Sequence, residues 1–221
     1  MNLETLTGSN IISLVPRRNQ AHFPALAQVE AYWEALRNTR PMPTREEVDP
    51  RGLTDALSYA FVLERIAPGL AKIRVAGQHL SDLMGMEVRG MPISAMFLPE
   101  ARQTLRDHLE ACFATPATLR LTLAADTGFT RPALEAQLFM APLKDRDGRP
   151  TRILGALQSS GKIGRAPRRF TIRSVKVNAL AGEVGAPDAP LAVPQRPAPG
   201  KRPAAPEPAK PGLRLVYSAE D

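Results

Sequence analysis

Two residues of this chain combine reactive chemistry with a helical spacing: Cys112 and the histidine four positions before it, His108. Side chains four apart share one face of a helix, so the imidazole could act as a metal ligand and the thiol as a redox-sensitive group. An alternative needs no chemistry, because Leu109 and Phe113 would surround the thiol with apolar groups, where a cysteine is inert. We expect this structural role for Cys112 and a place at the edge of an apolar stripe for His108.

Other patterns with chemical meaning are weaker. Gly77, Gly85 and Gly90 follow a short apolar run, but their spacings of 8 and 5 differ from the G-x-G-x-x-G pattern of a phosphate-binding loop. The single cysteine excludes an internal disulfide framework and a multi-cysteine metal site. Neither a nucleophile elbow nor a P-loop is present. We therefore expect no enzyme activity, no catalytic residue, no metal site and no tightly bound cofactor.

The net charge of +7 is unevenly distributed along the chain. Residues 1–161 hold 18 basic and 17 acidic residues, whereas residues 162–221 hold 11 and 5. A basic stretch such as 162–176, which contains Phe170, could bind nucleic acid or another anionic surface. A solvated extension explains the same charge without a partner, and we favour it.

Apolar periodicity predicts the elements that would position these residues. Pro24 can open a helix, and Leu26, Val29, Trp33 and Leu36 then recur at three- and four-residue steps. This stripe could cover the chain's own sheet or pair with a second copy of itself. A short helix is expected over 79–84 and a longer one over 99–115. Strands are expected over 58–66, 70–77, 117–125, 133–143 and 151–160.

Strands grouped around intervening helices indicate an α+β fold, with one five-stranded antiparallel sheet and helices on one face. In the second strand, Ala71, Ile73 and Val75 alternate with charged residues and are expected on one face. RRFTIRSV, residues 168–175, could add a short strand. The predicted divisions are an irregular N-terminus over 1–23, a domain over 24–161, a basic segment over 162–186, a proline-rich disordered linker over 187–212 and a short apolar motif over 213–221.

This order of elements resembles a bacterial PAS-like domain family that is largely uncharacterised. The stretches that carry the resemblance are YWEALRN at 32–38, PTREEVDP at 43–50 and the RVAG…GMEVRG run at 74–90. The resemblance covers about residues 27–160. It implies a five-stranded sheet with a small cavity under its helices, and a role in sensing small ligands, binding cofactors or forming dimers. Some PAS domains ligate haem through a histidine on the long helix, which makes His108 a weak haem-ligand candidate.

We therefore expect a non-catalytic sensory or regulatory module that acts by binding a ligand, a protein partner or a second copy of itself. Nucleic-acid binding through the basic segment and haem sensing are the alternatives. No membrane span or signal peptide is apparent, so we expect a cytoplasmic protein. The residues expected to line a ligand pocket are Phe61, Ile73, Leu83, Met96, Leu109, Leu138 and Leu157.

Overall fold

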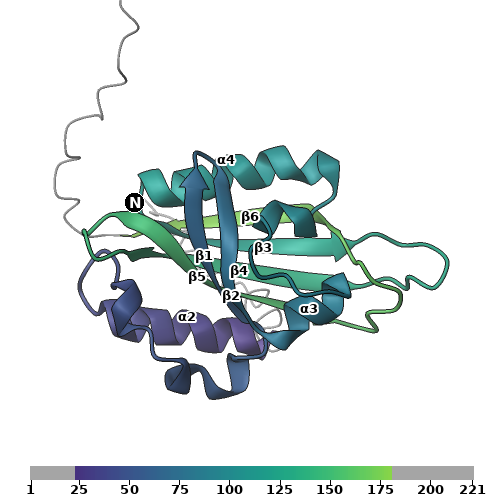
Figure 1. The fold of residues 1–221 in the computed structure, drawn as a ribbon, viewed down its shortest axis with the longest axis horizontal. Helices are drawn as coiled ribbons and strands as arrows, with labels where there is room; N and C mark the ends of the chain where they lie inside the picture. Colours follow the sequence, from purple (N-terminus) through teal and green to yellow (C-terminus); the bar gives the residue numbers. More distant parts are fainter. Residues whose placement is uncertain (1–22, 181–221) are drawn as a thin grey trace, which may run out of the picture. The chain divides into compact units, whose positions relative to one another are not determined.

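The computed structural model describes residues 23–180, and the predicted N-terminal segment, proline-rich linker and C-terminal apolar motif lie outside this range. The described part is an antiparallel sheet with helices on both of its faces (Figure 1). Its elements are, in chain order, α2 (Pro24–Arg37), η1 (Arg45–Glu47), η2 (Pro50–Ala56), β1 (Ala60–Ala67), β2 (Leu70–Ala76), α3 (Gln78–Met84), η3 (Ile93–Met96), η4 (Pro99–Ala101), α4 (Arg102–Ala114), β3 (Ala117–Ala125), β4 (Glu135–Lys144), β5 (Pro150–Ser160) and β6 (Phe170–Ala179).

The six strands follow the order β2-β1-β5-β4-β3-β6, and every neighbouring pair is antiparallel. This confirms the α+β class and all five expected strands. It also adds a sixth, because β6 pairs with β3 along its whole length. The sheet therefore continues past residue 161, where the expected domain ended, and includes the part of the basic segment that forms β6.

One face of the sheet is covered by the helices that lie between β2 and β3. Leu105, Leu109, Cys112 and Phe113 form the buried stripe of α4, as the periodicity predicts. They pack against sheet residues such as Leu121 in a cluster that we call the α4 cluster. Gly85 ends α3 with a φ of 69°, a backbone conformation that glycine adopts without strain.

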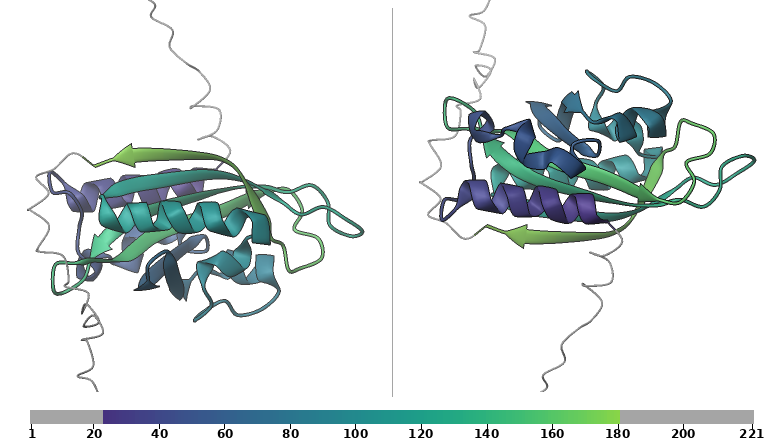
Figure 2. Two further views of the ribbon diagram at one scale, coloured as in Figure 1. Left: turned by 90° about the horizontal axis from the view of Figure 1, so that it is seen from above. Right: turned by 90° about the horizontal axis from the view of Figure 1, so that it is seen from below.

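The opposite face is covered by α2, which answers the question left open by its apolar stripe. Leu26, Val29 and Trp33 are fully buried against sheet residues that include Phe139, in a second group that we call the α2 cluster. The Trp33 indole N–H donates to the Pro142 carbonyl at 3.0 Å. The N-terminal stripe therefore packs on the sheet of its own chain, on the side away from α4 (Figure 2).

The hairpin of β1 and β2 departs from regular alternation. Val62 pairs with Val75 and Leu63 with Ile73, so one extra residue lies on β2 between the two pairs. Such a bulge moves the following side chain to the other face of the sheet. Val75 is consequently 52% exposed, whereas Ile73 is fully buried. The expected grouping of Val75 with Ala71 and Ile73 is wrong for this reason.

Candidate functional site

The structure brings the seven predicted pocket residues together in one place. All belong to the α4 cluster, and none is more than 2% exposed. They come from β1, β2, α3, η3, α4, β4 and β5, so residues distant in sequence meet between the sheet and its helices. Their role as pocket residues stays a prediction.

His108 and Cys112 occupy different environments on α4. His108 is half-buried beside the apolar stripe, while Cys112 is fully buried within it. The thiol donates a hydrogen bond to the Ala117 carbonyl at 3.1 Å, and burial raises the pKa of Cys112 to about 12. At neutral pH the thiol is therefore protonated and a poor nucleophile. Among residues 23–180, no group of three or more histidine, cysteine or acidic side chains is placed to hold a metal ion.

A separate hollow of about 450 Å³ lies on the α2 side of the sheet, between the β1–β2 hairpin and the segment that contains η1 and η2. This volume is within the range of about 300–1,000 Å³ typical of small-molecule sites. Its apolar lining comes mainly from Val48, Leu53, Leu57, Val62, Val75 and Leu154.

The hollow depends on two features that sequence periodicity does not reveal. The bulge in β2 places Val75 beside Val62 on this face. The short helix η2, whose first turn is fixed by the Asp49 carboxylate accepting from the Arg51 N–H at 2.9 Å, supplies the facing wall. The sequence pattern predicts no helix over residues 50–56, so η2 was not expected. Leu57 and Val75 are 46% and 52% exposed, and their exposed side-chain atoms form part of the apolar surface of the hollow.

Phe61 connects the predicted and the observed sites. It is the one member of the predicted set that also borders the hollow, and it belongs to the α4 cluster. Its cross-strand partner is Gly155, where an added Cβ would lie 2.4 Å from the Phe61 ring. Glycine at that position therefore leaves the space that the ring occupies. The hollow and the packing under α4 therefore share the Phe61 side chain.

Charged side chains gather where the hollow opens toward β1 and β5. Arg45 lines both the hollow and an adjoining depression that also contains Glu64, Arg74 and Arg152. Both Arg74 and Arg152 form ion pairs with Glu64. Burial by itself would raise the pKa of Glu64, but the hydrogen bonds from Arg152 and Arg74 outweigh it and the pKa is lowered. The carboxylate is thus ionised at neutral pH and shared by two guanidinium groups.

His79, at the start of α3, has a role that its position in the sequence does not indicate. Its Nε2 accepts the Ser159 backbone N–H at 3.2 Å and lies 3.1 Å from the Ser159 hydroxyl. Its ring packs against Tyr59 with centroids 4.8 Å apart. Burial lowers the pKa of His79, and the charge of Asp82 opposes this in part. The neutral imidazole therefore joins α3 to β5.

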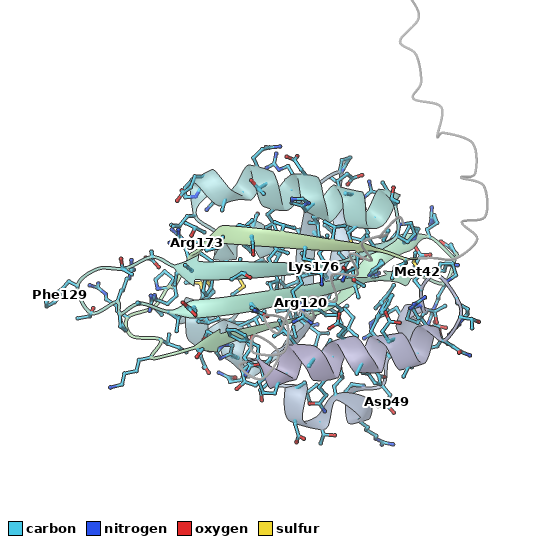
Figure 3. The ribbon with its side chains drawn as sticks, turned by 180° about the vertical axis from the view of Figure 1, so that it is seen from behind. Met42, Asp49, Arg120, Phe129, Arg173 and Lys176 are labelled. Carbon is cyan, nitrogen blue, oxygen red and sulfur yellow. The ribbon has the colours of Figure 1, made fainter. Side chains whose placement is uncertain are left out.

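The basic segment contains one arginine that is not available to a partner. Arg168 is fully buried and donates to three backbone carbonyls, those of Ile163, Asp126 at 2.7 Å and Pro132 at 2.8 Å. Its neighbour Arg169 is exposed. Arg173 and Lys176 on β6 are also exposed, and Lys176 lies opposite Arg120 of β3 (Figure 3).

Comparisons with known proteins agree with this architecture. A family model described as a PAS domain matches residues 21–158, and the chain belongs to the PAS domain family. This membership indicates a sensory or regulatory module. A comparison with curated proteins found no match. Among residues 23–180, no helix is long and apolar enough to cross a membrane.

Solved structures with some similarity are light-oxygen-voltage domains. One, from work with a flavin analogue, is 21% identical with a TM-score of 0.37, covering 51% of this chain and 84% of that one. The light state of the photoreceptor Aureochrome1 is 16% identical with a TM-score of 0.35, covering 51% and 88%. An RNA-binding light-oxygen-voltage receptor is 21% identical with a TM-score of 0.37, covering 52% and 35%.

Proposed function

We propose that this chain is a non-catalytic regulatory PAS module that binds a small ligand and passes the effect of binding to a protein partner. The observation that carries the proposal is the apolar hollow of about 450 Å³ beside the β1–β2 hairpin. Apolar concavities with a few polar groups are the usual sites of small ligands. The PAS family membership supports a sensory role for such a site.

A route from the hollow to the rest of the domain is available through Phe61 and Ala76. Both border the hollow and both contact the α4 cluster. Close-packed interiors respond to small displacements by shifting between discrete arrangements. Ligand binding would thus alter the packing under α3 and α4, whose outer surfaces are available to a partner. Self-association of the chain and a cytoplasmic location stay predictions.

Native mass spectrometry of the freshly purified full chain tests the ligand. We expect a small molecule that remains bound under native conditions and is released on denaturation. The absorption spectrum of the same sample tests the haem alternative, because haem bound through His108 would give a Soret band. A chain that carries no small molecule and whose thermal stability no candidate compound changes would contradict the proposal.

A second candidate function is binding to nucleic acid or another anionic surface through residues 162–176. Five exposed basic side chains favour it: Lys162, Arg165, Arg169, Arg173 and Lys176. The burial of Arg168 removes a sixth. Binding through phosphates should weaken steeply with salt. No shift of labelled DNA or RNA at low salt would exclude this function.

A further inference from the structure

The charged end of the hollow carries a surplus of positive charge. Arg45, Arg74 and Arg152 gather there, and the only carboxylate lining the depression with them is Glu64. Because Glu64 is shared by Arg74 and Arg152, one negative charge faces three positive ones. The acidic residues next to Arg45 on the other side reduce this surplus by one charge and leave it positive, since Glu46 is paired with Arg146, while Asp145 and Asp147 share Arg149.

Arg45 is the one guanidinium group at this end that forms no ion pair within residues 23–180. Its one side-chain hydrogen bond within residues 23–180 runs from Nη1 to the Val48 carbonyl at 3.5 Å, the outer limit for such a bond. A guanidinium group has five N–H donors in a planar arrangement that matches a carboxylate. Arg45 is half-buried at the boundary between the apolar lining and the charged depression.

We infer that the hollow binds an anionic amphiphile, a long-chain carboxylate whose head is held by Arg45 and whose aliphatic chain lies among Val48, Leu57 and Val75. This inference rests on the proposed function, because it names the ligand class for the same site. The lining is aliphatic and contains few polar groups, which suits a hydrocarbon chain. The arginine cluster lies at one end of the hollow, so it is complementary to a ligand with a single anionic group at one end of its chain.

The test uses two probes with the same chain length, dodecanoate and dodecan-1-ol, below the concentrations at which either aggregates. Binding to the full chain is followed by methyl NMR and by titration calorimetry. We expect dodecanoate to shift the methyl signals of Leu57, Val62 and Val75, and dodecan-1-ol to bind about tenfold or more weakly. The charged head makes this difference because hydrogen bonds to charged groups are the stronger ones.

Two variants and two matched controls locate the site. Arg45→Gln should weaken dodecanoate binding about ten- to hundredfold and leave dodecan-1-ol binding unchanged. Val75→Asp should weaken both probes. Arg173→Gln removes the same type of charge from an exposed position on β6, and Val177→Asp alters a valine that is 48% exposed on that edge strand. Neither control should affect binding.

Several results would overturn the inference. Equal affinity for the two probes, or an Arg45→Gln chain that binds dodecanoate as well as the wild type, would show that the head group is not recognised. Shifts confined to Leu109 and Leu138 would place the probe in the α4 cluster instead. If dodecanoate fails to bind while another molecule is retained by the wild type and lost from Val75→Asp, the ligand class is wrong and the proposed function stands. If Val75→Asp retains every ligand, the placement in the hollow fails as well.

Discussion

Arg168 and His79 show that some polar side chains of this domain stabilise the fold by hydrogen bonds inside it, and are not only part of its surface. Arg168 donates to three carbonyls in two loops that lie between strands, and its Nε is 3.6 Å from the Asp126 carboxylate. A buried charge is tolerated only when it is paired and hydrogen-bonded. This arginine therefore holds the loop before β6 against the β3–β4 loop, although its sequence context indicates a solvated basic stretch.

Replacing Arg168 by leucine should lower the free energy of unfolding by about 3–5 kcal/mol, because three carbonyls would lose a donor that is fully buried. Arg169→Gln is the matched control, since that side chain is exposed and its replacement should change stability by about 0.5 kcal/mol or less. Urea denaturation followed by circular dichroism measures both. Equal midpoints for the two variants would show that the carbonyls find other partners.

His79 should make stability depend on pH near neutrality. Its pKa in the folded protein is lowered from 6.5, mainly by burial, so the unfolded chain binds more protons and stability rises with pH. The contribution is fully present above about pH 6.5 and is lost as the pH falls toward the folded pKa.

A His79→Gln chain should therefore lose less stability than the wild type between pH 7.5 and pH 5.5. The glutamine oxygen can still accept the Ser159 N–H, and the carboxylates that titrate at lower pH are common to both chains. Denaturation midpoints at the two pH values provide the comparison. Identical losses in the two chains would mean that the folded imidazole accepts a proton without cost.

At the scale of elements, α2 is part of the domain because it supplies most of the covering on one face of the sheet. Its stripe is buried, and Glu30 forms an ion pair with Arg120 of β3. The Trp33 hydrogen bond to Pro142 adds a fixed position along β4. A helix with so much buried apolar surface stabilises the sheet mainly by packing rather than by its own helical propensity.

Trp33→Ala should cost about 3–5 kcal/mol, as truncation of a buried tryptophan usually does. Trp33→Phe keeps much of the apolar contact but loses the donor to Pro142, and should cost about 1–3 kcal/mol. Glu34→Gln on the exposed side of α2 is the control, with little expected effect. Circular dichroism is the suitable readout because Trp33 is the only tryptophan. A neutral Trp33→Ala result would show that α2 is dispensable.

At the scale of the whole molecule, the surplus charge lies in a different place from the one expected. Residues 181–221 contain five basic and five acidic residues, so the net charge of +7 belongs entirely to residues 1–180. Within that part, residues 162–180 contain six basic residues and no acidic one. Four of these six lie in the loop before β6, and the other two lie on β6 itself. The basic character is thus a property of the folded sheet edge.

A chain that ends at residue 180 should bind heparin as well as the full chain, because it has the same net charge. Replacing Lys162, Arg165 and Arg169 together by glutamine should lower the salt concentration at which the chain elutes. Elution from a heparin column measures both effects. A truncated chain that elutes at much lower salt would place the anion-binding charge after residue 180.

Most of the element boundaries can be predicted from local patterns in this sequence. Pro24 and Gly85 mark the start of α2 and the end of α3, and the alternation of Leu119, Leu121 and Leu123 predicts both β3 and its buried face. These predictions are confirmed because capping, proline geometry and side-chain periodicity act within a few residues. The predicted pocket set also meets in one cluster, since each residue lies on the apolar side of its own element.

By itself, the sequence determined the apolar side of α2, α4 and β3 and where most elements begin and end. The tertiary structure alone decided what covers each apolar side, whether α2 packs on its own sheet, and how β6 joins β3. It also decided that a bulge turns Val75 toward the hollow beside Arg45. The physical reason is that periodicity reports burial within one segment, whereas register and covering depend on hydrogen bonds and packing between segments far apart in the chain.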